Sequence, residues 1–244
     1  MQAIILAAGL AKRLRPLTDD SPKCLLPFGE KNLLHYTVEN IIANGINEFI
    51  VVTGYRENMI KNYLREHFSE LNITILTNSD FANNNNSYSL WMTKDYVKDD
   101  VLLLDSDIFF DKMIITKLLH SGYENCLAVN ITEKLDEEQI KVRVDDKKRI
   151  LEIGKEVNLA QASGESIGIE KFSKPCMDEM FKILDRKILK EKNVSEFYEV
   201  TFQEALAARR GKDERNSIYC VDVSNYRCME IDTVDDYNHA LKLI

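Results

Sequence analysis

The chain has 244 residues, of which 45% are hydrophobic and 30% are charged, and its net charge is −8 at pH 7. A chain of this length can bury about three quarters of its unfolded surface, so it needs neither a metal nor disulfides to fold, and its composition excludes a disordered protein. The negative charge disfavours binding to nucleic acid or to an acidic membrane unless basic residues gather in one place.

The five cysteines are scattered and form no CxxC pair, which is typical of reduced thiols in the cytoplasm. The N-terminus has no basic segment followed by an apolar core and a cleavage site, and no stretch approaches the length of a membrane span. We therefore expect a cytoplasmic protein with neither nucleic acid nor a membrane as its partner. A homodimer is compatible with the sequence.

The first half of the chain alternates short apolar runs with amphipathic stretches. The predicted strands are residues 3–8, 48–55, 72–78 and 100–110. The predicted helices are residues 32–45, 56–68 and 89–97. This alternation is typical of an α/β fold, a Rossmann-like, doubly wound and mostly parallel sheet with helices on both faces.

After about residue 125 the pattern loosens into shorter strands that we expect to be partly antiparallel. The predicted strands are residues 127–131, 141–146, 149–154, 163–172, 217–223 and 228–232. The predicted helices are residues 174–192, 199–211 and 233–244. With nine glycines and four prolines the chain has no obvious linker. We expect one domain, 1–244, whose mixed sheet carries a small extension.

The loop that follows the first strand is a candidate anion site. Ligands of open α/β sheets bind at the carboxyl ends of the strands. Ala7, Ala8 and Gly9 are small enough to let backbone N–H groups approach a phosphate, and Arg13 and Lys23 follow them. An ordinary solvated loop is the alternative.

Aspartates follow two other predicted strands. Asp105 and Asp107 lie two residues apart and would share one side of a continuing strand, where paired carboxylates suit Mg²⁺. Capping of a helix near Asp111, or a solvated turn, is the alternative. Asp232 is either a helix N-cap or a second metal ligand, and Thr233 could cap the helix instead, leaving Asp232 free.

No catalytic nucleophile is apparent in the sequence. The GxSxG, HExxH, CxxC and GxxxxGK[ST] patterns are absent, and the four histidines lie in amphipathic stretches. The sequence therefore disfavours serine hydrolases, zinc proteases and P-loop ATPases.

These pieces together resemble a known family. AIILAAGLAKRLRPLTDDSPKCLLPF is similar to the triphosphate-binding signature of the nucleotidylyltransferases that make activated sugars and alcohols. VLLLDSDIFF resembles the metal-binding strand end of that family, and EIDTVDDY resembles its second metal aspartate. One departure is Ala11, which stands where the family loop has its second glycine.

A second feature favours one branch of the family. Sugar-1-phosphate enzymes usually have a glycine-rich segment where this chain has ANNNNSYSLWM, and a second segment, SGESIGIEKFS, also bears on the branch. Both segments are more similar to the small cytidylyltransferases that act on phosphocholine, 2-aminoethylphosphonate or phosphoglutamine. The resemblance implies transfer of CMP from CTP to a small phosphorylated acceptor with an amine, release of pyrophosphate, dependence on Mg²⁺, and a role in capsule or other cell-surface biosynthesis.

The resemblance also implies roles for individual residues. Residues 1–125 would bind the nucleotide, and residues 126–244 would bind the acceptor and end with the metal aspartate. The implied catalytic residues are Arg13, Lys23, Asp107 and Asp232, of which the two aspartates would hold the metal. The implied nucleotide-binding residues are Leu6, Ala7, Ala8, Gly9, Ala11, Lys12, Arg13, Lys23, Asn86, Ser87 and Asp105. The implied acceptor-binding residues are Tyr88, Trp91, Glu165, Tyr198 and Glu199.

Three alternatives stay open at this point. Tyr88 and Trp91 lie three residues apart and could be core residues on one helix face. The enzyme could be a sugar-1-phosphate nucleotidylyltransferase that uses UTP or dTTP. The chain could also be a non-catalytic nucleotide-binding module, although Lys23, Asp107 and Asp232 are all present.

Overall fold

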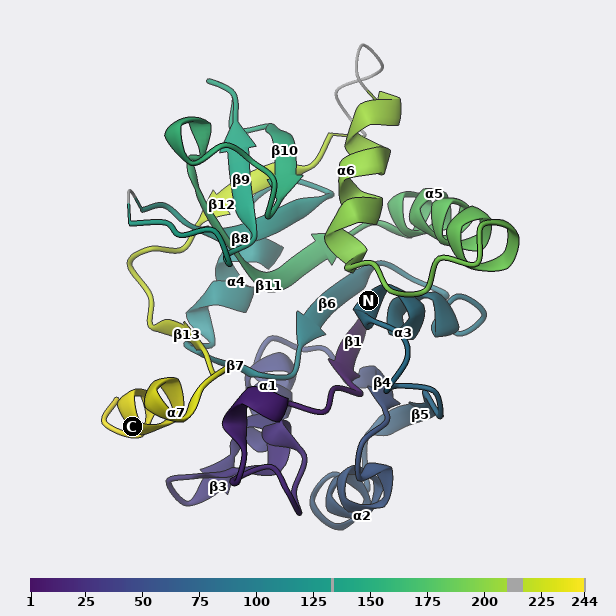
Figure 1. Ribbon diagram of the computed structural model, residues 1–244, viewed down its shortest axis with the longest axis vertical. Helices are drawn as coiled ribbons and strands as arrows, with labels where there is room; N and C mark the ends of the chain where they lie inside the picture. Colours follow the sequence, from purple (N-terminus) through teal and green to yellow (C-terminus); the bar gives the residue numbers. More distant parts are fainter. Residues whose placement is uncertain (133, 210–216, 244) are drawn as a thin grey trace.

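A mixed sheet of nine strands forms the centre of the computed structural model, which describes residues 1–132, 134–209 and 217–243 (Figure 1). Strand β1 (Gln2–Ala7) lies between β4 (Glu48–Thr53) and β6 (Val101–Asp105), and β5 (Asn72–Thr77) pairs with β4. All four strands are parallel. Every residue of β1 is buried, as expected of a parallel strand covered by helices on both faces.

The second half of the chain extends this sheet with mostly antiparallel pairs. Strand β11 (Gly164–Phe172) pairs antiparallel with β6 and so joins the two halves. The other strands of the extension are β8 (Cys126–Asn130), β9 (Lys141–Val144), β10 (Ile150–Gly154) and β12 (Tyr219–Asp222). Two short ribbons lie outside the main sheet, β2 (Pro27–Phe28) with β3 (Lys31–Asn32), and β7 (Ile108–Phe110) with β13 (Cys228–Glu230).

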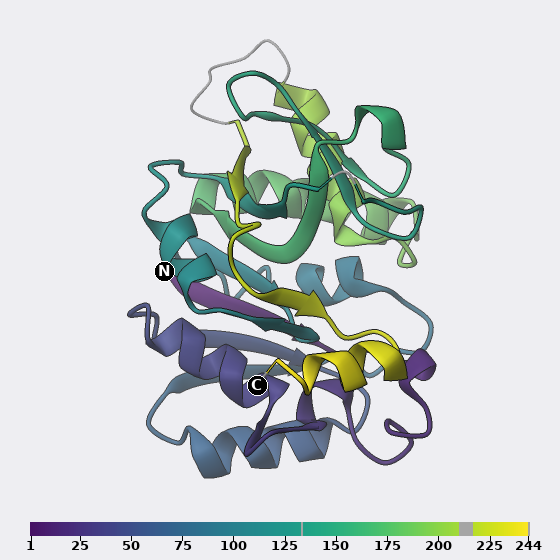
Figure 2. The same ribbon diagram turned by 90° about the vertical axis from the view of Figure 1, so that its left-hand side faces the viewer.

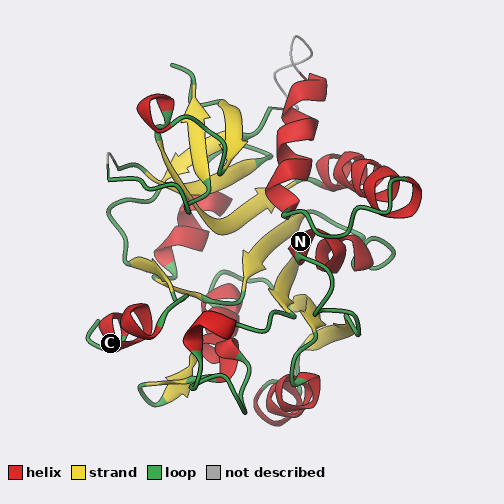
Figure 3. Ribbon diagram, in the orientation of Figure 1, coloured by secondary structure: helices red, strands yellow, loops and turns green. Residues whose placement is uncertain are grey.

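Helices cover both faces of the sheet (Figures 2 and 3). Those whose apolar residues pack on one face are α1 (Leu33–Ile42), α2 (Glu57–His67) and α4 (Met113–Leu119). Those that pack on the other face are α3 (Asn86–Met92), α5 (Lys174–Asp185) and α6 (Tyr198–Arg209). The predicted α/β, Rossmann-like doubly wound fold is confirmed. None of the helices in the described ranges is long and apolar enough to cross a bilayer.

The prediction of one continuous strand over residues 100–110 is wrong. Strand β6 ends at Asp105, the chain turns through Ser106 and Asp107, and β7 leaves the main sheet to pair with β13. The polar Asp-Ser-Asp sequence cannot continue a central strand whose residues are buried on both faces. Asp105 and Asp107 therefore do not share one side of a continuous strand.

Several helix ends also differ from the prediction. Helix α3 begins at Asn86 because the side chain of Asn85 accepts a hydrogen bond from the backbone N–H of Asn86 as its N-cap. Helix α5 continues into a π-helical turn, Arg186–Lys190. The last helix, α7 (Val234–Ala240), ends before the predicted residue 244, which lies outside the described residues, as do residues 210–211 of the helix predicted at 199–211.

Candidate active site

A cavity of about 580 Å³ opens at the carboxyl ends of β1 and β6. Most of the predicted site residues line this cavity. They are Leu6, Ala7, Ala8, Gly9, Ala11, Arg13, Lys23, Asn86, Asp105, Asp107, Glu165, Glu199 and Asp232. The sheet thus brings together residues that are more than 200 positions apart in the sequence, as the strand-end rule for open sheets anticipates.

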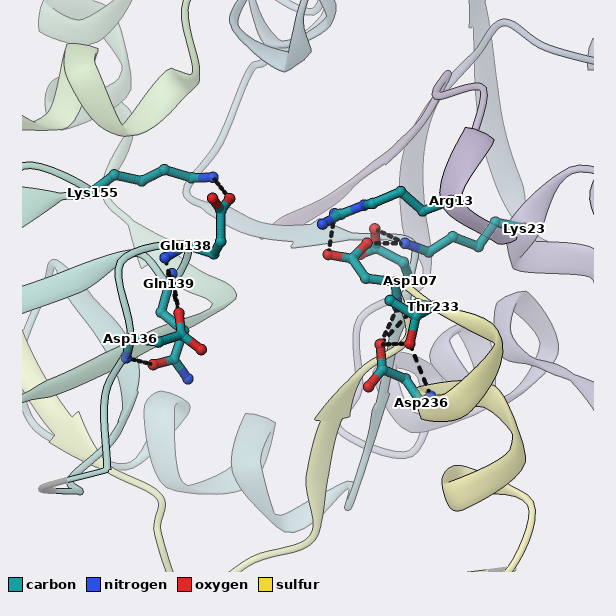
Figure 4. A network of polar contacts seen from close by, with 10 residues as sticks. Arg13, Lys23, Asp107, Asp136, Glu138, Gln139, Lys155, Thr233 and Asp236 are labelled. Atoms are coloured by element: carbon teal, nitrogen blue, oxygen red, sulfur yellow. Dashed lines mark hydrogen bonds and ion pairs between the residues drawn. The ribbon is translucent and has the colours of Figure 1, made fainter. Parts of the chain in front are cut away.

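Three carboxylates form a cluster at one end of the cavity. Ligand atoms of Asp107, Glu230 and Asp232 lie within 4.8 Å of one another. The ammonium of Lys23 lies 2.8 Å from Asp107 Oδ2 and 2.7 Å from Asp232 Oδ1, and Arg13 donates to Asp232 Oδ2 at 2.5 Å (Figure 4). The other oxygen of Asp107, Oδ1, is buried and has no hydrogen-bond partner among the described residues. An all-oxygen donor set with an unsatisfied carboxylate oxygen fits a hard divalent cation such as Mg²⁺.

Local structure explains why Asp232 is available to this cluster. Thr233 is the N-cap of α7, and its hydroxyl and the carboxylate of Asp236 form a capping box, so Asp232 is not needed as the cap. Pairing of β13 with β7 brings the end of β13 to Asp107, whose carbonyl accepts a hydrogen bond from the N–H of Ile231 at 2.9 Å. The N-cap alternative for Asp232 is therefore wrong.

The electrostatics of the cluster favour a bound cation. Burial and the carboxylates of Asp107 and Asp232 raise the pKa of Glu230 to about 8. Burial opposes the charged form of Lys23, but Asp107 and Asp232 outweigh it and raise its pKa. Burial likewise opposes ionisation of Asp232, yet Lys23 and Arg13 lower its pKa. A further positive charge beside these carboxylates would oppose the rise in the pKa of Glu230.

Ala11 holds a backbone conformation that favours glycine. It lies in the left-handed region, with φ 46° and ψ 49°, and precedes a 3₁₀ turn that carries Arg13. Its carbonyl accepts hydrogen bonds from the N–H of Leu14 and the hydroxyl of Thr18, which hold the loop in place. The positive φ at this position therefore explains why the family signature has a glycine there.

Replacing Ala11 with glycine should raise the free energy of unfolding by about 1 kcal/mol, because glycine adopts a positive φ without the Cβ strain. Urea denaturation measures this change. Ala43→Gly is a matched control, since Ala43 has a φ of −60° and should lose stability on the same substitution. Equal destabilisation by both substitutions would contradict the strain at Ala11.

An asparagine-rich segment lines the same cavity as the loop that follows β1. Asn78, Asn84, Asn85, Asn86 and Ser89 line the cavity. The side chains of Asn78 and Asn84 bond to each other at 2.7 Å and 3.1 Å, and Asn78 also donates to Ser89 at 3.1 Å. The four successive asparagines at 83–86 therefore form a turn and also supply polar groups to the cavity.

Several predicted site residues lie outside the cavity lining. Lys12 is exposed, and Ser87 is buried behind the lining residues. Tyr88 and Trp91 pack against the core, and Trp91 Nε1 donates to Asp185 at 2.9 Å. Because their apolar faces are occupied by core contacts, the core alternative describes Tyr88 and Trp91 better than the acceptor-binding prediction.

Tyr198 lies outside the cavity lining and contacts one of the lining residues, Asp105. It is fully buried, and its hydroxyl donates to Asp105 Oδ2 at 2.8 Å. Burial, together with nearby carboxylates, raises the pKa of Asp105 and of Glu170 well above the ordinary carboxyl range. Gly168, with φ 68°, allows β11 to pass close to Asp105, because a Cβ there would lie 2.9 Å from Asp105 Oδ2. Tyr198 and Asp105 therefore contribute to the shape of the site.

Carboxylates also line the part of the cavity formed by the second half of the chain. Glu165 is half-buried and Glu199 is 6% exposed, and both face the cavity. Glu199 Oε2 is buried without a hydrogen-bond partner among the described residues, and burial raises the pKa of Glu199 to about 7. An unsatisfied buried carboxylate is a binding group for a cation or an ammonium.

Replacing Glu199 with glutamine should stabilise the protein at alkaline pH. Since the folded pKa of about 7 is above the ordinary value of 4.5, the wild type has its full stability below pH 4.5 and loses part of it as the pH rises through 7. Glutamine avoids this loss, so the free energy of unfolding should rise by about 1–3 kcal/mol near pH 8.5 and change little near pH 4.5. Urea denaturation at both pH values tests this, with exposed Glu66→Gln as control. A gain that is the same at both pH values would contradict the burial of an ionised Glu199.

The residues of the cavity lining that sequence reasoning missed include Glu230, Asn78, Lys155 and Phe197. Glu230 could have been found, because it lies two residues before Asp232 on one predicted strand and so on the same side. Asn78 follows a predicted strand and could have been found by the strand-end rule. Nothing in the local pattern marks Lys155 or Phe197.

Comparison with known proteins gives consistent matches. Residues 2–150 match the family model described as nucleotidyl transferase. The chain is 31% identical to the CTP:phosphoglutamine cytidylyltransferase of Campylobacter jejuni, over 97% of each chain. It is 26% identical to the choline-phosphate cytidylyltransferase of Streptococcus pneumoniae, over 100% of this chain and 98% of the relative.

Solved structures show the same fold. The CTP:phosphocholine cytidylyltransferase of Streptococcus pneumoniae superposes with a TM-score of 0.81 at 24% identity, covering 99% of this chain and 98% of the other. The inositol-1-phosphate CTP transferase of T. maritima has a TM-score of 0.79 at 24% identity, covering 99% and 94%.

Proposed function

Since the chain belongs to the nucleotidyl transferase family, we propose that it is a Mg²⁺-dependent cytidylyltransferase that transfers CMP from CTP to a small phosphorylated acceptor carrying an amine. The observation that carries this proposal is the cluster of Asp107, Glu230 and Asp232, which meets Arg13 and Lys23 at one end of the cavity. The half-buried carboxylate of Glu165 and the buried carboxylate of Glu199, which line the same cavity, suit an amine on the acceptor.

The proposed reaction needs no general base. An oxygen of the acceptor phosphate attacks the α-phosphorus of CTP and forms a new P–O bond. The bond from the α-phosphorus to the oxygen that bridges to the β-phosphate breaks, and pyrophosphate leaves with the electron pair. A phosphate monoester with a second pKa of about 6 is already largely dianionic at pH 7. No histidine is among the described residues that line the cavity, so the serines of the lining have no histidine there to activate them, which agrees with this chemistry.

The residues of the chain would then act by placing positive charge around the phosphate groups of both substrates. Asp107, Glu230 and Asp232 would hold Mg²⁺, which supplies neutralisation of the triphosphate and of the leaving pyrophosphate. Lys23 and Arg13 would bind phosphate oxygens, and the small residues of the Ala7–Gly9 loop would allow backbone N–H groups to approach them. Attack between two anions becomes feasible because positive charge surrounds both.

Two features support CTP and the small acceptor. Two relatives that match over almost the whole of both chains are named as cytidylyltransferases of phosphoglutamine and of choline phosphate. The wall of Asn78, Asn84 and Asn86 offers amide groups that can pair with the edge of a pyrimidine. We propose that the product serves cell-surface decoration and is made in the cytoplasm, which the five free cysteines favour.

The proposal is tested by nucleotide and acceptor panels. Thermal shift with CTP, UTP, dTTP, GTP and ATP in the presence of Mg²⁺ should show the largest stabilisation with CTP. Pyrophosphate release should then require CTP together with a phosphorylated amine. A preference for UTP or dTTP with a sugar 1-phosphate would favour the sugar-nucleotide alternative, and binding without pyrophosphate release from any acceptor would favour a non-catalytic module.

A further inference from the structure

One lysine lies on the cavity wall opposite the Arg13–Lys23 network (Figure 4). Among the described residues that line the cavity, Lys155 is the only lysine or arginine apart from Arg13 and Lys23. Its ammonium lies 3.0 Å from Glu138 Oε2 and 5.5 Å from the centre of the Phe197 ring. A positive charge is therefore present at the end of the cavity that the proposed mechanism does not use.

The pair between Lys155 and Glu138 leaves this charge available to a ligand. The side chain of Lys155 is 37% exposed and that of Glu138 is 79% exposed. Ion pairs between exposed side chains contribute about 0–1 kcal/mol, so an incoming anion can replace Glu138 or share Lys155 with it. Glu138 therefore holds Lys155 weakly and keeps it directed toward the cavity.

Lys155 lies near the start of α6, because its ammonium is 5.5 Å from the centre of the Phe197 ring and Phe197 is two residues before Glu199. Strand β10 and helix α6 are in contact, since the N–H of Ile153 donates to Gln203 Oε1 at 2.8 Å. Lys155 directly follows β10, and Glu199 is in the first turn of α6. Burial raises the pKa of Glu199, and the ammonium of Lys155 partly opposes that rise, as expected for neighbouring charges. The lining of one cavity thus includes a cation and a buried carboxylate that interact electrostatically.

We propose that the acceptor is a zwitterion, a phosphorylated amino acid or a close derivative, whose carboxylate binds Lys155 and whose ammonium binds Glu199. This inference rests on the proposed function and narrows its acceptor class. An acceptor with an ammonium alone, such as phosphocholine, satisfies Glu199 but offers nothing to Lys155. A phosphorylated amino acid matches both charges, and the unpartnered Oε2 of Glu199 gains a hydrogen-bond donor.

Matched acceptors test the inference with the full chain, CTP and Mg²⁺. O-Phosphoserine carries both groups, O-phosphoethanolamine lacks the carboxylate, and 3-phosphoglycerate has a hydroxyl in place of the amine. We expect kcat/KM for pyrophosphate release to be at least about tenfold higher with O-phosphoserine than with either of the others, because each of them leaves one charged group without its partner.

Variants identify the residues that make the distinction. Lys155→Met should lower kcat/KM for O-phosphoserine about tenfold and change that for O-phosphoethanolamine less than about twofold, whereas Lys155→Arg should retain the preference. Lys174→Met is the matched control, since Lys174 also pairs with a single carboxylate, that of Asp178, and its side chain is 32% exposed. Glu199→Gln should lower kcat/KM for both amine acceptors at least about fivefold more than for 3-phosphoglycerate, which has no amine.

The outcomes separate this inference from the proposed function. Cytidylyl transfer to phosphoethanolamine or phosphocholine at a rate equal to or above that for O-phosphoserine would overturn the inference and leave the proposed function intact. A Lys155→Met variant that loses activity equally with all acceptors would also overturn it, because Lys155 would then contact the phosphate that all of them share. No pyrophosphate release with any of these acceptors, but release with a sugar 1-phosphate, would overturn both.

Discussion

Replacing Asp107 with asparagine should reduce turnover by at least about a hundredfold while the protein stays folded. Asp107 is the member of the carboxylate cluster whose buried Oδ1 lacks a partner, and its Oδ2 contacts Lys23. Asparagine keeps the size of the side chain but removes the charge, so the cation would be held by Glu230 and Asp232 alone. The stabilisation of charge on the leaving pyrophosphate is then lost, which costs on the order of 3 kcal/mol.

The rate of pyrophosphate release and the affinity for Mg²⁺ together check this prediction. Calorimetric titration of the free protein with Mg²⁺ should show weaker binding in Asp107→Asn, and circular dichroism should show an unchanged fold. Asp95→Asn, at an exposed position outside the cavity lining, is the matched control and should behave as wild type. Turnover within a few fold of wild type in Asp107→Asn would remove Asp107 from the proposed mechanism.

Replacing Lys23 with methionine should also reduce turnover about a hundredfold or more. Lys23 is the most deeply buried cation of the cluster, with 11% of its side chain exposed, and it contacts both Asp107 and Asp232. Methionine retains the aliphatic stem but leaves the carboxylates to repel one another. Because those carboxylates are 25% and 28% exposed, we expect a loss of about 1–3 kcal/mol in the free energy of unfolding, less than for a fully buried pair.

Stabilisation by Mg²⁺ distinguishes an electrostatic role of Lys23 from a role in packing alone. Millimolar Mg²⁺ should raise the melting temperature of Lys23→Met more than that of wild type, because the ion replaces the missing positive charge among the carboxylates. Lys31→Met is a suitable control, since Lys31 pairs with Glu39 away from the cavity and is 34% exposed. If Mg²⁺ stabilised Lys23→Met no more than wild type, Lys23 would not share the cluster with the cation.

The sequence by itself predicted the α/β fold, the family and the phosphate end of the site. Buried strands are marked by continuous apolar runs, and ligand groups of open sheets lie at strand ends, so Arg13, Lys23, Asp107 and Asp232 could be selected from local pattern. The resemblance to the nucleotidylyltransferases is confirmed by the match over residues 2–150. The residue roles themselves stay predictions for the variants above to test.

The tertiary structure alone decided the rest. The break after Asp105 and the pairing of β7 with β13 bring Glu230 to Asp107. Contact between β10 and α6 places Lys155 and Glu199 in the lining of one cavity. Tyr88 and Trp91 are partly buried and pack against the core outside the cavity lining, although their spacing suited a binding face equally well. The physical reason is that these contacts come from burying apolar surface between segments far apart in the chain, and spacing along the sequence records periodicity within one element but not which elements meet.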